Sequence, residues 1–340
     1  MRVLVTGGAG YIGSHAVREL LRAGHEVTVL DDLSKGHREA VDAQAEFVLG
    51  DTGDFDTVKK VLTDRRIEAV LHFAAYIEVG ESVEDPYKYY GNNFANALNL
   101  LEAMRAAQVK KIVFSSTAAV YGNPERVPIE ETALRQPINP YGRSKMMTEM
   151  AIEDASRAYG LGFAILRYFN VAGASPDGTI GEAHEPESHL IPRLLAAAAE
   201  GKPAMIYGTD YPTPDGTCIR DYIHVVDLVN AHILALEHVR EGEGNIYNLG
   251  SENGFSVREV IEACRKVTGR EFKADEHPRR PGDPASLVAS SSRIRQLGWQ
   301  RQYPDLETIL AHAWNWHSTH PKGYKSRAER VAPRANEAQI

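Results

Sequence analysis

The sequence has few cysteines, no long apolar run and no excess of positive charge. Its 340 residues include two cysteines, Cys218 and Cys264, and neither stands in a CxxC motif or a Cys/His cluster with metal-ligand spacing. We therefore expect buried free thiols and a reducing, cytoplasmic location. The first seven residues reach a glycine before any apolar stretch long enough for a signal peptide or a membrane span, so we expect no export or anchoring signal.

Charge and composition exclude further classes of protein. Lysine and arginine total 38 against 46 acidic residues, which leaves a net charge of −8 and no basic footprint for nucleic acid or an anionic membrane. Hydrophobic residues make up 43% and charged residues 25%, as in ordinary globular proteins. The 13 histidines show no HExxH spacing, so we expect no metal site. We expect a small-molecule partner and neither a nucleic-acid nor a membrane partner.

The first half of the chain alternates short apolar runs with longer helical patterns, which is typical of βαβ units. Helices are predicted over 85–108, where Phe94, Leu98 and Leu101 share one apolar face, and over 141–159. The apolar runs predict six buried parallel strands, at 2–6, 26–30, 46–49, 69–73, 111–115 and 163–167. The fold class is therefore α/β, with a Rossmann-type doubly wound parallel sheet that binds ligands beyond the carboxyl ends of its strands.

Beyond about residue 170 the pattern changes to helices separated by long loops rich in glycine and proline. We expect a dinucleotide-binding Rossmann domain over 1–173 and a smaller substrate-binding domain over 174–325, with boundaries that interleave. The last segment, 326–340, is predicted to be a frayed, solvated tail.

A glycine-rich segment, Gly7-Gly8-Ala9-Gly10-Tyr11-Ile12-Gly13, follows the first strand and opens a helix. Glycines let the backbone approach a pyrophosphate closely, and the helix N-terminus offers unpaired N–H groups to it. Asp31 ends the next strand about 20 residues after Gly10, where a carboxylate accepts the ribose hydroxyls. A carboxylate there repels a 2′-phosphate, so NAD is favoured over NADP unless Lys35 intervenes.

Two further groups follow later strands and would flank the same cofactor. Asp51 stands just past the third strand, where it could meet the adenine edge, and Phe73-Ala74-Ala75 stands past the fourth. For both groups a purely structural role is an equally good interpretation.

Tyr141 and Lys145 start the helix predicted over 141–159, and their i, i+4 spacing puts the phenol and the ammonium on one face. A tyrosine pKa must fall from about 10 to about 7 for general-base work at neutral pH. Lys145 and an oxidised nicotinamide ring would both favour the phenolate, while Thr117 could hydrogen-bond the same substrate hydroxyl. The YxxxK string alone is weak, and its position after the fifth strand and Thr117 makes it a candidate acid/base pair.

These motifs together resemble the extended short-chain dehydrogenase/reductase family over nearly the whole chain. Within it, the segments 167–174, 220–228 and 279–283 are similar to those of the UDP-sugar 4-epimerases. The resemblance implies a homodimer through the helices around 94–104 and 146–159. It also implies interconversion of UDP-galactose and UDP-glucose by transient oxidation at sugar C4, rotation of the 4-keto sugar and return of the hydride.

The resemblance assigns the site residue by residue. The catalytic residues would be Tyr141, Lys145 and Thr117. NAD would be held by residues from the glycine-rich turn and from later strand ends: Gly7, Gly10, Tyr11, Ile12, Gly13, Asp31, Asp51, Phe73, Ala74, Ala75, Asn92, Tyr141, Lys145 and Tyr168. The UDP-sugar would be held by Thr117, Tyr141, Asn170, Leu190, Tyr207, Arg220, Arg280 and Asp283, and arginine forks suit its diphosphate.

Departures from the family pattern leave alternatives open. His189 stands where asparagine is usual, which leaves the role of this residue open. Leu287 is intermediate in size at the position that controls room for an N-acetyl group, so UDP-N-acetylhexosamines or UDP-pentoses are alternative substrates. A nucleotide-sugar dehydratase would carry Asp-Glu after the catalytic hydroxyl residue, where this chain has Ala118-Ala119. A net NAD-dependent dehydrogenase and a non-enzymatic NAD sensor are further alternatives.

Overall fold

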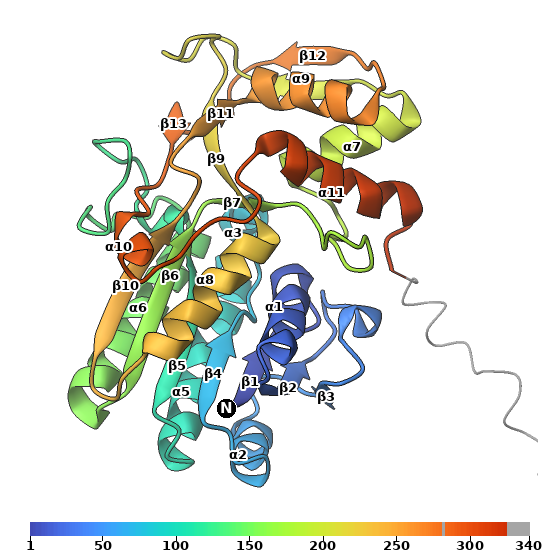
Figure 1. Cartoon of the computed structure of the whole chain (residues 1–340). Helices are drawn as coiled ribbons and strands as arrows, with labels where there is room; N and C mark the ends of the chain where they lie inside the picture. The colour runs from blue at the N-terminus through green and yellow to red at the C-terminus, as the bar shows by residue number, and fades with distance from the viewer. Residues whose placement is uncertain (281–282, 325–340) are drawn as a thin grey trace, which may run out of the picture.

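Seven parallel strands form the central sheet of the computed structural model, which describes residues 1–280 and 283–324 (Figure 1). From one edge to the other the order is β3-β2-β1-β4-β5-β6-β10. The strands are β1 (Arg2–Thr6), β2 (Glu26–Asp31), β3 (Glu46–Leu49), β4 (Ala69–His72), β5 (Lys111–Thr117), β6 (Gly162–Tyr168) and β10 (Gly244–Leu249). The predicted doubly wound sheet is confirmed, with a topological switch point between β1 and β4.

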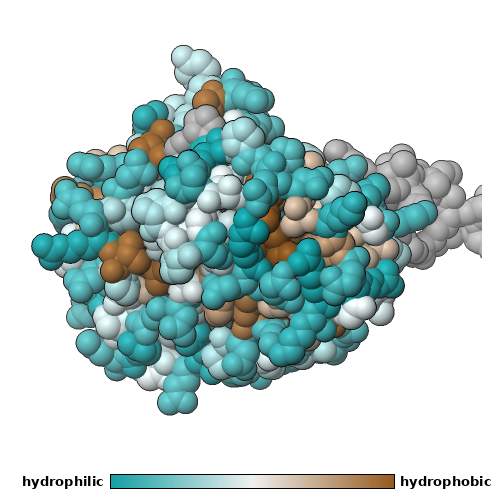
Figure 2. All heavy atoms as spheres, turned by 90° about the horizontal axis from the view of Figure 1, so that it is seen from above, coloured by the Kyte–Doolittle hydropathy of each residue, from teal (hydrophilic) through white to brown (hydrophobic). Residues whose placement is uncertain are grey.

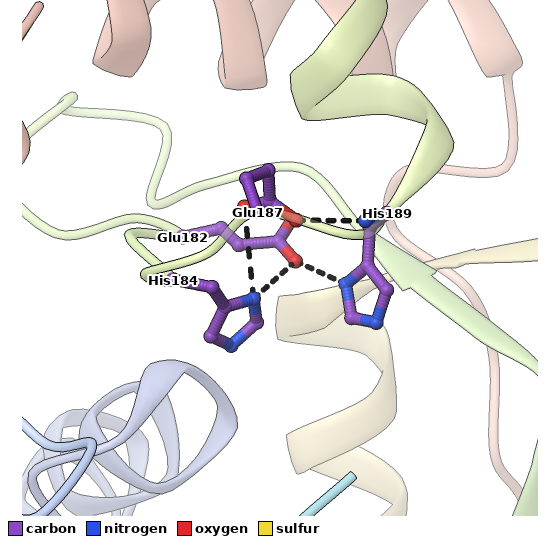
Figure 3. A group of neighbouring side chains, drawn as sticks. All are labelled: Glu182, His184, Glu187 and His189. Carbon is purple, nitrogen blue, oxygen red and sulfur yellow. Dashed lines mark hydrogen bonds and ion pairs between the residues drawn. The ribbon is translucent and has the colours of Figure 1, made fainter. Parts of the chain in front are cut away.

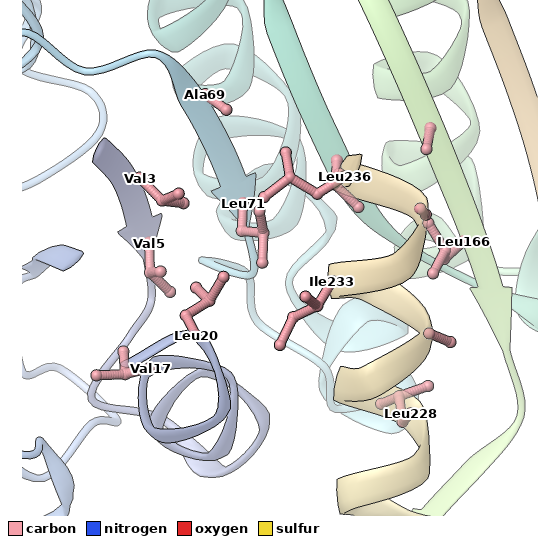
Figure 4. Close-up of a cluster of buried hydrophobic side chains, with 14 of the residues drawn as sticks. Val3, Val5, Val17, Leu20, Ala69, Leu71, Leu166, Leu228, Ile233 and Leu236 are labelled. Atoms are coloured by element: carbon pink, nitrogen blue, oxygen red, sulfur yellow. The ribbon is translucent and has the colours of Figure 1, made fainter. Parts of the chain in front are cut away.

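Helices cover both faces of this sheet. α1 (Tyr11–Arg22) and α8 (Val225–His238) lie on one face, and α2 (Phe55–Asp64), α5 (Asn96–Ala106) and α6 (Pro140–Tyr159) on the other (Figure 1). The core between the sheet and the first pair of helices is mainly aliphatic (Figure 4). It includes Val3, Val5, Val17, Leu20, Ala69, Leu71, Leu166, Leu228, Ile233 and Leu236.

Two sequence predictions about these elements were wrong in detail. Strand β3 is not buried, because it forms the sheet edge and pairs only with β2, which leaves Leu49 66% exposed. The single helix predicted over 85–108 consists of α4 (Pro86–Tyr89), a π-helical segment η2 (Tyr90–Ala95) and α5. The wider π turn shifts the face that follows, so Leu100 and Met104 are buried while Leu98 is 42% exposed.

A smaller layer lies beyond the carboxyl ends of the sheet strands. Its helices are α7 (Leu190–Glu200), α9 (Val257–Thr268) and α11 (Leu306–Thr319), which pack on one another. Its strands form two groups: β7 (Asn170–Ala172), β9 (Ile219–His224), β11 (Gly254–Ser256) and β13 (Ser286–Leu287), and the pair β8 (Ala204–Tyr207) and β12 (Ala274–His277). Short helical segments complete the fold: η1 (Arg38–Ala40), α3 (Val79–Glu84), η3 (Ala118–Val120) and α10 (Ser292–Gln296).

The two layers interleave along the chain. After β7 the chain builds α7, β8 and β9, returns to the central sheet as α8 and β10, and leaves again for β11 and α9. The boundary at residues 173 and 174 stays a prediction. The central layer contains α8 and β10, which follow this boundary, and the smaller layer contains β7, which precedes it. The tail predicted over 326–340 lies outside the described residues.

Surface and cysteine features agree with the composition. The face above α9 and β12 is mostly hydrophilic, with small separate hydrophobic patches (Figure 2). Both Cys218 and Cys264 are buried and unpaired, as expected. Among residues 1–280 and 283–324, no helix has the length and apolar run that crossing a membrane requires.

Candidate active site

The glycine-rich turn between β1 and α1 forms a narrow backbone cradle. Gly7 has a φ of +70°, and a Cβ there would stand 2.6 Å from the backbone nitrogen of Ala74. A Cβ on Gly13 would overlap the carbonyl oxygen of Gly7. Gly10 caps α1 without a side-chain hydrogen bond, so the first-turn N–H groups are free to receive an anion. These features fit a dinucleotide pyrophosphate.

Asp31 lies at the end of β2 with its carboxylate against this turn. Its Oδ2 accepts a hydrogen bond from the Ala9 N–H at 2.9 Å, and its Oδ1 accepts one from the Leu33 N–H at 2.8 Å. Each carboxylate oxygen keeps a second lone pair, so ribose hydroxyls could still bind. Lys35 is engaged with Glu78, 3.4 Å away, and with the carbonyl of Glu185 at 3.2 Å. Its ammonium is therefore already neutralised, which supports NAD over NADP.

Two adjoining cavities share Gly7, Gly10 and Phe73 in their walls. The smaller cavity, of about 110 Å³, is also lined by Asp31, Asp51, Ala74, Ala75 and Asn92, all predicted to hold NAD. Asp51 Oδ1 additionally accepts hydrogen bonds from the Gly53 N–H and the Asn96 amide. The larger cavity, of about 280 Å³, contains the remaining predicted cofactor residues: Tyr11, Ile12, Gly13, Tyr141, Lys145 and Tyr168.

Helix α6 places the predicted acid/base pair in the larger cavity. Asn139 caps the helix by accepting a hydrogen bond from the Gly142 N–H at 2.8 Å, and Pro140 occupies the first turn. Tyr141 and Lys145 then lie one turn apart on the buried face, and Thr117 reaches the same cavity from the end of β5. The structure thus brings together the three residues predicted to be catalytic.

The protonation equilibria of this pair differ from the sequence-based expectation. Burial raises the pKa of Tyr141 to about 12, although a hydrogen bond with Thr117 works in the opposite direction. Burial lowers the pKa of Lys145 to about 7, partly opposed by the Glu149 carboxylate. The Lys145 ammonium donates to the carbonyl of Ser115 at 2.8 Å. These side chains alone therefore do not produce the predicted low tyrosine pKa, since Lys145 is itself desolvated.

A buried ion pair connects β6 to α6 directly behind the site. Arg167 donates to both carboxylate oxygens of Glu149, at 2.9 and 2.6 Å, and both side chains are fully buried. Ser116 and Arg135 also donate to this carboxylate. Glu149 lies one helical turn beyond Lys145, so the pair fixes the part of α6 that carries the acid/base residues.

The predicted UDP-sugar residues fall into two groups. Asn170 and Leu190 line the larger cavity. Tyr207, Arg220, Arg280 and Asp283 line neither cavity. Arg280 lies over the Tyr207 ring at 4.0 Å, and an Arg220 nitrogen is 3.7 Å from a carboxylate oxygen of Asp283.

Strand β9 links the two groups. Residues two apart on a strand face the same side, and Tyr222 on β9 lines the cavity, so Arg220 extends this wall outward. Tyr222, Tyr76 and Glu78 are wall residues that the sequence predictions omitted. The position of Tyr76 and Glu78 beyond the carboxyl end of β4 was the available signal.

His189 and Leu287 mark the departures from the family pattern. His189 caps α7 without a side-chain hydrogen bond to that helix, and its ring contacts the Glu182 carboxylate instead. Burial lowers the pKa of the His189 imidazole, and the nearby Glu182 carboxylate more than offsets this, so the pKa is raised. Leu287 pairs in register with Arg220 and packs on a small cluster that contains Tyr121.

Comparisons with known proteins agree with this geometry. The model of the NAD-dependent epimerase/dehydratase family matches residues 3–250. A UDP-glucose 4-epimerase of Lacticaseibacillus casei is 52% identical over 330 residues, which span 96% of this chain and 100% of the relative.

Two solved structures are similarly close over nearly the whole chain. The Brucella ovis UDP-glucose 4-epimerase in complex with NAD is 47% identical with a TM-score of 0.89, over 92% of this chain and 97% of that one. The Bifidobacterium longum enzyme in complex with NAD+ and UDP is 38% identical with a TM-score of 0.91, over 95% and 100%. Because the family match spans most of the sequence and the relatives align over their full length, this chain belongs to the NAD-dependent epimerase/dehydratase family.

Proposed function

We propose that this protein interconverts UDP-galactose and UDP-glucose with NAD, by oxidising and then re-reducing the sugar at C4. The observation that carries the proposal is one cavity that contains the glycine-rich turn, Thr117, Tyr141 and Lys145 together. The similar proteins named UDP-glucose 4-epimerase support the same activity. Family membership supports NAD as the cofactor.

In the proposed mechanism Tyr141 moves a proton at the sugar 4′-hydroxyl. The phenolate accepts this proton as C4 is oxidised and returns it as C4 is reduced, so no net oxidation occurs. Bound NAD would supply the hydride acceptor and, in its oxidised form, a positive ring that favours the phenolate. Thr117 would hold the same hydroxyl. Lys145, held by the Ser115 carbonyl, would supply positive charge close to the Tyr141 phenolate.

Inversion at C4 requires the sugar to present its other face before the hydride returns. We infer that the nucleotide is held firmly while the hexose is held loosely. The polar anchors proposed for the nucleotide, Arg220, Arg280 and Asp283, stand away from the cavity that contains Tyr141. The 4-keto sugar could then rotate about its diphosphate link without losing these contacts.

A direct assay tests the proposal. Purified protein incubated with UDP-galactose, without and with added NAD, should produce UDP-glucose without net accumulation of NADH. Accumulating NADH would indicate a dehydrogenase instead, and bound dinucleotide without sugar turnover would indicate a sensor. A dehydratase product is not expected, because Ala118 and Ala119 offer no carboxylate next to Thr117.

A sister 4-epimerase activity is the second candidate, because of Leu287. Its side chain packs on the same small cluster as Phe169, and Phe169 lines the larger cavity, so the size of Leu287 bears on the room next to the sugar. Parallel assays with UDP-N-acetylglucosamine and a UDP-pentose separate these substrate classes. We expect the hexose pair to have the highest kcat/KM.

We also propose a cytoplasmic homodimer. Helices α5 and α6 pack side by side, and their outward faces carry Leu98, Met150 and Tyr159, which are 42%, 47% and 59% exposed. Two such helix pairs could bury these side chains against each other in a four-helix contact. The free thiols of Cys218 and Cys264 support a reducing compartment.

A further inference from the structure

Four side chains of the loop before α7 converge on one point (Figure 3). They are Glu182, His184, Glu187 and His189, and one potential ligand atom from each lies within 4.8 Å of the others. The Nδ1 of His184 is 3.2 Å from Glu182 Oε1 and 3.6 Å from Glu187 Oε2. The Nδ1 of His189 contacts the same oxygen of Glu182. Histidine spacing alone predicted no metal site, because the pattern differs from HExxH.

The separations match those of a tetrahedral metal site. Bonds of about 2.0 to 2.2 Å from a zinc ion to nitrogen and oxygen ligands place neighbouring ligands about 3.3 to 3.6 Å apart. Both measured distances from His184 lie close to this range. His189 and Glu182 must move apart, and the His189 side chain is 42% exposed and has room to do so. The other pairs of ligand atoms lie within 4.8 Å, so small side-chain movements would complete the shell.

The charge of the cluster is compatible with a divalent cation. The Glu182 side chain is 3% exposed and that of Glu187 23%, so two carboxylates with limited access to water lie beside the two imidazoles and need compensating positive charge. One divalent ion would supply this charge and contact all four groups at once.

We propose that Glu182, His184, Glu187 and His189 bind one divalent transition-metal ion of the Zn²⁺ type. Imidazole nitrogen favours such ions over Mg²⁺ and Ca²⁺, which prefer oxygen alone. Four protein ligands fill a tetrahedral shell and leave no open position, so the site is structural. This inference does not rest on the proposed epimerase activity.

The bound ion would fix the loop that connects the two layers. The Glu182 carbonyl accepts a hydrogen bond from the Trp316 indole at 3.0 Å, and the Tyr11 ring of α1 packs edge-on against His184. His184 and His189 themselves line the larger cavity, as does Leu190, which follows His189 directly. The ion would thus hold α1, the loop and the start of α7 in one arrangement.

Metal titration of tag-free, chelator-treated protein tests the proposal. Zn²⁺ should bind at one ion per chain and raise the Tm, because it stabilises only the folded form. Co²⁺ should bind at the same stoichiometry and give the intense visible absorption of a tetrahedral site. Mg²⁺ at equal concentration should give neither effect. Absence of stoichiometric binding and of the Co²⁺ absorption would overturn the proposal.

Variants identify the ligands. His184→Gln and Glu187→Gln each remove one ligand, so Zn²⁺ affinity should fall at least about tenfold. His238→Gln removes an exposed histidine at the end of α8 and should bind as the wild type does. If either ligand variant is poorly folded by circular dichroism, the other decides the result. Wild-type affinity in a folded ligand variant would overturn the assignment, whatever the epimerase assay gives.

Discussion

At the scale of single residues, the central feature is the buried Tyr141 phenol, which lies next to Thr117 and one helical turn from Lys145. Tyr141→Phe keeps the ring and removes the group that carries the proton. We expect kcat to fall about 10²- to 10⁴-fold while the dinucleotide stays bound. Steady-state kinetics measure the rate, and absorbance of the purified protein measures the cofactor. Turnover within a factor of three of wild type would exclude Tyr141 as the acid/base group.

Buried neutral histidines should make the fold sensitive to mild acid. Burial lowers the pKa of His232 to about 4, only partly opposed by its hydrogen bond to the Leu228 carbonyl, and its Nε2 has no partner. In the unfolded chain His232 takes up a proton near pH 6.5, whereas in the native state it does so only near pH 4. Its contribution to the free energy of unfolding is therefore complete above pH 6.5 and is lost as the pH falls from 6.5 to 4.

His232→Leu should reduce this dependence. The wild type should lose about 2 kcal/mol between pH 7.5 and 5 through His232 alone, and the variant should not. Urea unfolding at the two pH values measures the difference. The control His238→Leu changes an exposed histidine and should keep the wild-type dependence. An equal change in unfolding free energy between pH 7.5 and pH 5 in the wild type and in His232→Leu would contradict the prediction.

Residues of the candidate site were predictable where a short sequence motif determines the local backbone conformation. Residues of the glycine-rich turn, Asp31 and the YxxxK pair, which local motifs single out, all line the two cavities. The raised pKa of Tyr141 was not predictable, because it depends on burial by residues distant in sequence. The same holds for the convergence of His184 and His189 on Glu182, which requires a loop path that no local pattern specifies.

At the scale of elements, the Arg167–Glu149 pair joins β6 to α6. Arg167→Met leaves the Glu149 carboxylate buried with less compensation, so we expect a loss of about 3 to 5 kcal/mol in unfolding free energy. Arg167→Met combined with Glu149→Met should recover part of this loss. Denaturant unfolding at pH 7.5 gives these values.

A surface pair of an arginine and a carboxylate is the control. Arg157 contacts Asp154 on the exposed side of α6, and its side chain is 73% exposed. Arg157→Met should change stability by less than about 1 kcal/mol. A similar effect of both arginine substitutions would show that burial does not decide the contribution of Arg167.

Most sheet elements were predictable from apolar runs, and the failures have local causes. Strand β10 was not predicted, because Gly244–Leu249 contains three asparagine or glycine positions and pairs only with β6 at the sheet edge. The break in the helix over 85–108 depends on the π-helical η2, whose packing against α6 is tertiary. The periodicity of apolar residues indicates which helix face is buried. It does not show where a π-helical turn adds one residue to the α-helical repeat.

At the scale of the whole molecule, the exposed face of α5 and α6 should determine association. Met150→Arg places an unpaired charge at the centre of the proposed contact, so we expect a monomer at micromolar concentration. Light scattering measures the mass. Met205→Arg is the control, because Met205 is similarly exposed, at 42%, on β8 in the other layer. A dimer that survives Met150→Arg, or is lost in both variants, would place the interface elsewhere.

The repeated passage of the chain between the layers has a consequence for how the molecule can come apart. A fragment that ends at residue 173 would lack α8 and β10. The part of the sheet face that α8 covers would then be exposed to solvent, and β6 would become an unpaired edge strand. We therefore expect that neither half folds as a separate module. Heating should therefore unfold both layers in one calorimetric transition, without a separate melting of the substrate-side layer.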